Sequence, residues 1–300
     1  MNSLLGKTLA GALGILLLSS GIAAAQETID PALLTPVETA LESTRALDSL
    51  RIHTQSLTET SAEFGDVSIQ TESEMNLVRT EADWNAAGTI GVIGELPVIG
   101  TLDISGEVVL IEGTTYVRFG DLPDGLPIEL PQTWTTTDTL ETSGGFIPLP
   151  TTADGLLGVL NLPITAETVT AIAALPQDEI DGQTMTVTQV SLDPAAVLES
   201  DAASLVTVAG PGAGGNVPGG LTPPDGQQLP EEITPPEPED IQVTLAIYVG
   251  AEDGYVHRIY LLVNVVESED GTRAGGTITT LSDYSNFDEP VEITAPIVGS

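Results

Sequence analysis

The sequence predicts an α+β protein that is mostly β, built from antiparallel strands with a few short helices. Thr, Val, Ile and Gly dominate its apolar stretches, and aromatic residues make up only 4% of the chain, which favours strands. Apolar and polar residues also alternate with a period of two in many segments, whereas helical spacing is rare. With 41% hydrophobic residues the chain can bury a substantial core.

The clearest strands lie in residues 240–296, which read as a meander of three or four strands. Asp-Gly pairs at 253–254 and 270–271 suit tight turns because glycine reaches positive φ easily. The predicted strands are IQVTLAIYVG, HRIYLLVNVV, AGGTITTL and a short PVEITAP. In the first of them one side carries Val243, Leu245, Ile247 and Val249, and the other carries Thr244, Ala246 and Tyr248. One face of this meander is therefore apolar and needs a cover.

A second hairpin is predicted between residues 101 and 119. Its first strand puts Leu102, Ile104, Gly106, Val108 and Leu110 on one face, Glu112-Gly113 forms the turn, and Val117 and Phe119 continue the buried face.

The other elements are predicted from local signals. Thr35 as N-cap with Pro36 at the first helical position starts a helix that runs to about Leu50. Two half-exposed strands follow at 53–60 and 67–79. Apolar spacing indicates short helices at 152–160 and 165–175. Strand composition returns at 183–192, and Asp193-Pro194 then carries the cap signal of a short helix.

Residues 209–240 lose the hydrophobic pattern and are rich in Gly and Pro, the composition of a linker or disordered loop. The four strands predicted after it are too few to bury both faces of a sheet alone. We therefore expect residues 26–300 to form a single domain with an insertion at 209–240.

Residues 1–25 read as a signal peptide, with Lys7, an apolar stretch and a small-residue cleavage site at 23–25. We expect an exported, soluble, periplasmic or extracellular protein with no transmembrane span after signal removal.

The chain has 44 acidic and 7 basic residues and a net charge of −37, so it should not bind nucleic acid. The absence of cysteine excludes disulfides and thiolate sites.

No motif for catalysis, metal or cofactor binding is present. His53 and His257 stand on separate predicted strands, and no nucleophile elbow or phosphate loop occurs. We expect no enzyme activity, no catalytic residues, no metal and no cofactor. A hydrolase built on an acidic pair is the remaining enzymatic alternative, because 44 carboxylates leave many possible pairs.

A large apolar sheet face with few short helices to cover it leaves two possibilities. The helices either leave an apolar cavity that takes a lipid or acyl chain, or they fill the space completely. The pattern alone does not separate them.

The order of elements resembles the LolA/LppX-like superfamily, and within it the LppX/LprG-type lipid-carrier lipoproteins. The segments that carry the resemblance are GEVVLIEGTTYVRF with Trp134 after it, GYVHRIYLLV, and the closing TTLSDYSNFDEPVEITAP. The resemblance implies a curved antiparallel half-barrel, covered on its concave side by helices, that holds the acyl chains of a lipid or an acylated lipoprotein. Unlike the lipoprotein members, the chain has no cysteine for a lipid anchor.

The resemblance makes a lipid carrier of the cell envelope the leading hypothesis, with residues 152–175 as a lid. The alternative is an envelope sensor or regulatory interaction protein that has an envelope protein partner and no cargo. The predicted lining residues are Leu102, Ile104, Val108, Leu110, Val117, Leu245, Ile247, Val249, Ile259, Leu261 and Val263.

Overall fold

The computed structural model describes residues 29–62, 65–81, 83–96, 100–121, 130–137, 155, 157–199, 237–266 and 275–298. The predicted signal peptide and most of the predicted insertion lie outside these residues. So do the predicted turn at 270–271 and the start of the helix predicted at 152–160.

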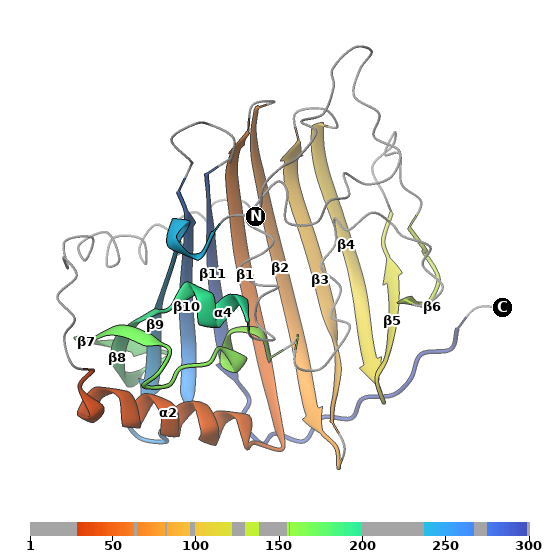
Figure 1. Ribbon diagram of the computed structural model, residues 1–300. Coiled ribbons are helices and arrows are strands. Elements are labelled where there is room, and N and C mark those ends of the chain that lie inside the picture. The colour runs from red at the N-terminus through yellow and green to blue at the C-terminus, as the bar shows by residue number, and fades with distance from the viewer. Residues whose placement is uncertain are drawn as a thin grey trace.

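The described chain forms one curved, unclosed, 11-stranded antiparallel sheet, with short helices on its concave side (Figure 1). This confirms the predicted fold class. The strands run in the order β6-β5-β4-β3-β2-β1-β11-β10-β9-β8-β7. The sheet contains β1 (Ser49–Ala62), β2 (Gly65–Arg79), β3 (Trp84–Leu96), β4 (Gly100–Ile111), β5 (Thr114–Phe119), β6 (Thr135–Thr136), β7 (Val169–Ile180), β8 (Gln183–Leu192), β9 (Ile241–Gly250), β10 (Val256–Val265) and β11 (Gly276–Ser285).

Tight turns at glycines join several of these strands, two of them at the predicted turns Glu112-Gly113 and 253–254. Glu112 and Gly113 have φ values of 50° and 77°, so β4 and β5 are joined by two residues in the left-handed region, as a type I′ hairpin requires. Asp181 and Gly182 join β7 to β8 in the same way, with φ values of 51° and 83°. At Gly254, φ is 73° in the turn between β9 and β10.

The concave side carries α2 (Pro31–Arg45), α4 (Pro194–Leu198) and the 3-10 helix η3 (Gly158–Asn161), while the 3-10 helix η4 (Pro238–Asp240) leads into β9. Figure 1 shows α2, η3 and α4 in front of the half of the sheet that contains β7 to β11. As predicted, Asp193 caps α4, and its Oδ1 accepts a hydrogen bond from the Ala195 amide at 3.0 Å.

The first helix begins earlier than predicted. Asp30 caps it by accepting a hydrogen bond from the Ala32 amide at 2.9 Å, and Pro31 takes the first helical position. Thr35-Pro36 carries the same signature one turn later, but Pro36 lies inside the helix. The helix also ends at Arg45, before the predicted Leu50, because β1 begins at Ser49.

The helix predicted at 165–175 is wrong. Residues 165–168 form a single turn, and Val169–Ile180 is the edge strand β7. The turn at Asp181-Gly182 folds this segment back along β8, and the ladder hydrogen bonds prevail over a weak helical pattern. Pro176 fits because it lies where the pairing with β8 shifts register, on an edge strand that needs no further amide donor.

The fourth meander strand, predicted at 290–296, is also absent. Residues 286–298 run below the ends of the strands, in the direction of β5 (Figure 1). They could not join the meander because both edges of β11 are already occupied, by β10 and by β1. The segment is held at its start, where the Asp288 amide donates to the Ser49 carbonyl and the Ser49 hydroxyl to the Glu289 carbonyl.

Candidate binding face

The concave face of the sheet carries all the predicted lining residues, but in two separate clusters. The large cluster also contains side chains of α2, η3 and α4, and the small cluster lies over β3, β4 and β5 with Leu130. The large cluster includes Val108, Leu110, Leu245, Ile247, Ile259, Leu261 and Val263, with Val249 half-buried against it. The small cluster includes Leu102, Ile104 and Val117. Apart from Val249, these side chains are at most 3% exposed, and their lining of a cavity stays a prediction.

The opposite, convex face is not uniformly polar. Ala246 and Tyr248, predicted on the polar side of β9, are buried there with Met185, Tyr260 and Leu281. Apolar contacts therefore stabilise both faces of the sheet over β8 to β11.

Carboxylates are absent from the concave face of the described parts of β1–β5 and β9–β11. The registers of these strands put their acidic side chains on the convex face, where several pair with arginines. Arg51 pairs with Glu74, Arg118 with Glu107, and Arg258 with Asp283. The arginine of these strands that does face the concave side is Arg79, at the end of β2, where its guanidinium stacks on Trp84 and donates to the Leu47 carbonyl. A chain with a net charge of −37 thus keeps the concave face of these strands free of described carboxylates.

Hydroxyl side chains interrupt the apolar concave face where β11, β1 and β2 lie side by side, and six of them stand together in two adjacent rows. We call them the hydroxyl patch: Thr54, Ser56, Thr71, Ser73, Thr280 and Ser282. One row across the sheet reads Leu261, Thr280, Ser56, Thr71, Val92 and Ile104, strand by strand. The next row reads Ile259, Ser282, Thr54, Ser73 and Ile90. Predicted lining residues stand on both sides of the patch.

The patch escaped sequence reasoning because it depends on the pairing of β1 with β11. Thr54 and Ser282 are far apart in the sequence and meet only through this register. Alternation in residues 51–79 gives the faces of β1 and β2 but not their neighbours. The available signal was the run of Thr and Ser at alternate positions in both β1 and β11.

One polar link joins two elements of the cover to each other, and a second joins the cover to the sheet. The Arg45 guanidinium at the end of α2 donates to the Leu160 carbonyl of η3, with Nε at 2.8 Å. Burial lowers the pKa of Arg45, partly offset by Glu42. The buried Thr44 hydroxyl accepts a hydrogen bond from the Val256 amide at 2.9 Å, which ties α2 to the start of β10.

Tyr284 lies on the concave face between Arg45 and the hydroxyl patch. Burial raises the pKa of its phenol, and a hydrogen bond with Ser282 lowers it in part. Tyr284 therefore stays neutral at physiological pH and adds a hydroxyl at the end of the patch nearest to α2.

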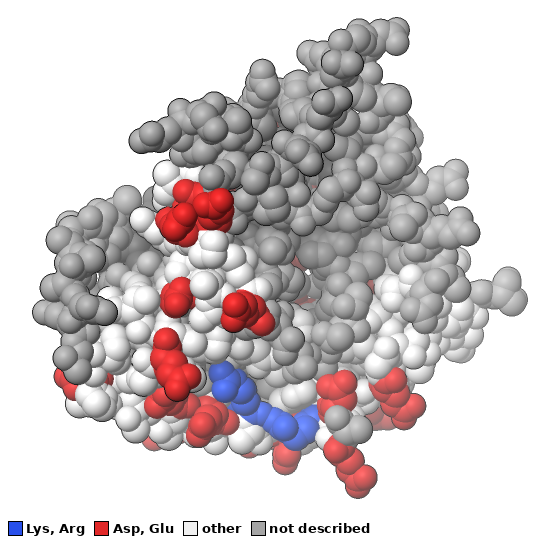
Figure 2. Space-filling model, in the orientation of Figure 1, with Lys and Arg blue, Asp and Glu red and all other residues white. Residues whose placement is uncertain are grey.

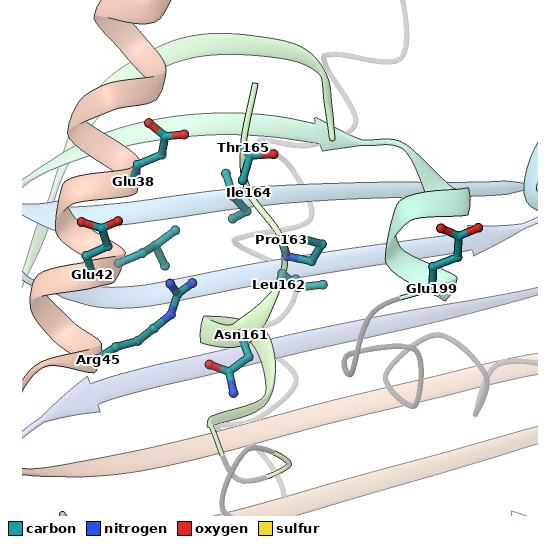
Figure 3. A pocket seen from close by; sticks show the side chains of 10 residues that line it. Glu38, Glu42, Arg45, Asn161, Leu162, Pro163, Ile164, Thr165 and Glu199 are labelled. Carbon is teal, nitrogen blue, oxygen red and sulfur yellow. The ribbon is translucent and has the colours of Figure 1, made fainter. Parts of the chain in front are cut away.

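A pocket of about 520 Å³ opens between α2 and the segment 161–165 (Figure 3). Glu38, Glu42 and Arg45 reach it from α2, and Glu199 stands at its other side after α4. Leu41, Leu162 and Ile164 give it an apolar floor. In the orientation of Figure 1, acidic side chains are scattered over the front of the molecule, and the basic ones visible there lie near its lower edge (Figure 2).

Two kinds of site were searched for within the described residues. These residues include no group of three or more His, Asp or Glu side chains placed to hold a metal ion. No helix among them has the length and apolar character needed to cross a membrane.

Several known protein structures match the chain in a structural comparison. LprF from Mycobacterium bovis matches with 13% identity and a TM-score of 0.45, over 91% of this chain and 100% of its own. The lipoprotein LppX from Mycobacterium tuberculosis matches with 13% identity and a TM-score of 0.42, over 88% of this chain and 100% of its own. A putative outer membrane lipoprotein-sorting protein domain from Vibrio parahaemolyticus matches with 10% identity and a TM-score of 0.24, over 87% of this chain and 94% of its own.

No protein-family model and no curated protein sequence matches the chain. At these identities and TM-scores the structural likenesses assign no function, so the functional argument rests on the chain's own residues. One of these structures is of LppX, a protein of the type that the sequence resembles.

Proposed function

We propose that the protein is an exported carrier that holds the acyl chains of a lipid or an acylated lipoprotein against the concave face of its sheet, and that it is not an enzyme. The observation that supports this is the segregation of charge. The concave face of β1–β5 and β9–β11 bears no described carboxylate, although the chain has 44 acidic residues. An apolar surface this broad, free of negative charge, suits a hydrocarbon guest.

The guest has to displace the cover, because the proposed lining side chains are already buried. The cover consists of α2, η3 and α4, which are short and joined by few polar links. Each methylene that moves from water to an apolar site contributes about 0.8 kcal/mol, so eight of them contribute roughly 6 kcal/mol. The guest also replaces the apolar contacts of the displaced side chains, and the polar part of the cost is one or two hydrogen bonds at about 1 kcal/mol each.

The movable part of this cover is shorter than the predicted lid. Since residues 169–175 belong to β7, the proposed lid is limited to the segment around η3. Arg45 joins this segment to α2 by hydrogen bonds. The pocket in Figure 3 lies where this segment and α2 separate, and its volume is within the usual range for ligand sites. We place the entry of the guest there, with release by the reverse movement.

Native mass spectrometry of the protein purified from a cell-envelope fraction tests the proposal, together with titration of a fluorescent fatty-acyl probe. We expect a bound lipid mass and saturable probe binding. If no lipid copurifies and no probe binds, the carrier function is wrong. A stable protein partner in place of lipid would then favour the sensor alternative.

A matched pair of variants locates the binding. Ile104 is 2% exposed on the concave face, and Ile93 is 50% exposed on the convex face of the neighbouring strand. Ile104→Ala should weaken probe binding about 3- to 10-fold, because it removes apolar contact area. Ile93→Ala should leave it unchanged. Equal affinities of the two variants, both shown folded by circular dichroism, would place the probe elsewhere.

A further inference from the structure

We propose that the hydroxyl patch is the binding site for the uncharged ester groups of the lipid, and that the acyl chains of the lipid lie over the apolar clusters on either side of the patch. This inference rests on the proposed function and adds the chemical class of the guest's polar part. It follows from the placement, the hydrogen-bonding capacity and the electrical neutrality of the patch.

The placement suits a molecule with a polar middle and two apolar arms. In both rows described above, hydroxyls occupy β11, β1 and β2, and aliphatic side chains follow on β10 and on β3. Strands lie about 4.8 Å apart, so the patch is roughly 10 Å wide from β11 to β2. That width matches a glycerol unit with its ester groups.

The patch has hydrogen-bonding capacity to spare. The Thr54 and Ser282 hydroxyls are 3.1 Å apart, and the Ser56 and Thr280 hydroxyls are 3.0 Å apart. Each hydroxyl has one proton and two acceptor sites, so the Ser56–Thr280 pair, which shares one bond, keeps one proton to donate. Ser282 also bonds Tyr284, and the three hydroxyls of Thr54, Ser282 and Tyr284 share two bonds and likewise keep one proton. Thr280 and Ser282 are 5% and 2% exposed, so water reaches them little. A polar group removed from water without a full set of partners costs free energy, and an ester carbonyl supplies the missing acceptor.

The surroundings favour an uncharged group. The described carboxylates of these strands lie on the other face, and Arg79 stands six residues from Ser73 along β2, roughly 20 Å away. The nearer cation, Arg45, approaches Tyr284 and already bonds the Leu160 carbonyl. A phosphate or ammonium seated on the patch would lose its hydration without gaining a counter-ion, which costs several kcal/mol.

The test compares dioleoylglycerol with its dioleyl ether analogue, which has the same chains and backbone but no carbonyl groups. Both compete with the fluorescent acyl probe for the full-length protein. We expect the diester to bind at least about fivefold more tightly than the diether. We expect the double variant Thr54→Val with Ser56→Ala to lose this preference while it keeps its affinity for the diether.

The matched control is Thr89→Val with Ser105→Ala, the same two changes at exposed positions of the convex face. It should retain the preference of the unmodified protein. Urea unfolding of both variants shows that they are folded.

The outcomes separate the two proposals. If the acyl probe binds but diester and diether compete equally, the patch is not an ester seat, although the carrier function stands. Retention of the preference by the Thr54/Ser56 variant, or tighter binding of dioleoyl phosphatidic acid than of dioleoylglycerol, overturns the inference in the same way. If no probe binds at all, the carrier function itself fails.

Discussion

Arg45 is the residue on which the cover of the sheet most depends. Its guanidinium donates to the Leu160 carbonyl through Nε and a terminal nitrogen, and it is partly buried between α2 and η3. Each arginine that the structure describes has such a partner: Arg51, Arg118 and Arg258 pair with carboxylates, and Arg79 bonds a carbonyl. Arg45 differs from these because it joins two elements of the cover, α2 and η3.

We expect Arg45→Met to lower the free energy of unfolding by about 1–3 kcal/mol, because the Leu160 carbonyl loses charged donors at a site that water reaches poorly. Urea unfolding at neutral pH measures the change. Arg51→Met is the control, since the Arg51–Glu74 pair is exposed and should contribute less than about 1 kcal/mol. Equal losses in the two variants would mean that Arg45 is an ordinary surface charge.

Residues whose position follows from alternation could be predicted from the sequence, and residues whose role follows from register could not. Leu102, Ile104 and Leu261 lie on the concave face because side chains alternate along any strand. Thr54 and Ser282 become neighbours only when β1 pairs with β11, and no local sequence pattern encodes that pairing. The apolar half of the candidate face was therefore predictable and its hydroxyl patch was not.

At the scale of elements, the sequence signals were reliable where a turn dictates the geometry. Glu112-Gly113 reaches positive φ and fixes the hairpin that was predicted around it. Predictions failed where distant partners decide: β7 is a strand because it pairs with β8, and residues 290–296 form none because β11 has no free edge. Asp30-Pro31 and Thr35-Pro36 carry the same cap signature; the prediction took the second, whereas the first starts the helix.

The position of Pro36 inside α2 leads to a prediction about helix stability. A proline there offers no amide hydrogen to the carbonyl one turn earlier, and its ring crowds that carbonyl. We expect Pro36→Ala to raise the free energy of unfolding by about 1 kcal/mol or more, measured by urea unfolding.

Pro31→Ala is the matched control for Pro36→Ala. Pro31 occupies the first helical position, where an amide hydrogen has no partner within the helix. Its replacement should change stability by less than about 0.5 kcal/mol. The explanation is wrong if Pro36→Ala is neutral or destabilising.

For the whole molecule, the dominant electrostatic feature is uncompensated negative charge. The chain carries 44 acidic and 7 basic residues, and the described arginines are already engaged. With the concave face of β1–β5 and β9–β11 free of described carboxylates, the described acidic groups of these strands lie on the convex face, and others lie on the covering elements. Their mutual repulsion opposes the compact state.

Salt should therefore stabilise the fold. The Debye length falls from about 30 Å at 0.01 M to about 10 Å at 0.1 M salt, which weakens repulsion between carboxylates on the surface. We expect the urea midpoint to rise as sodium chloride increases from 0.01 to 0.5 M. Tetramethylammonium chloride should give the same rise, because screening depends on ionic strength and not on a specific cation. A midpoint that stays constant or falls would show that the repulsion is not significant.

The sheet is not closed, since β6 and β7 stand at its opposite ends and do not pair with each other. In a closed barrel, strand number and shear together fix the radius. Here no such constraint acts, so the arc can widen or tighten by small changes of twist between neighbouring strands while every ladder bond remains intact. In the proposed carrier, the same backbone therefore accommodates lipids of different width. Selectivity among these lipids then depends on polar recognition more than on size.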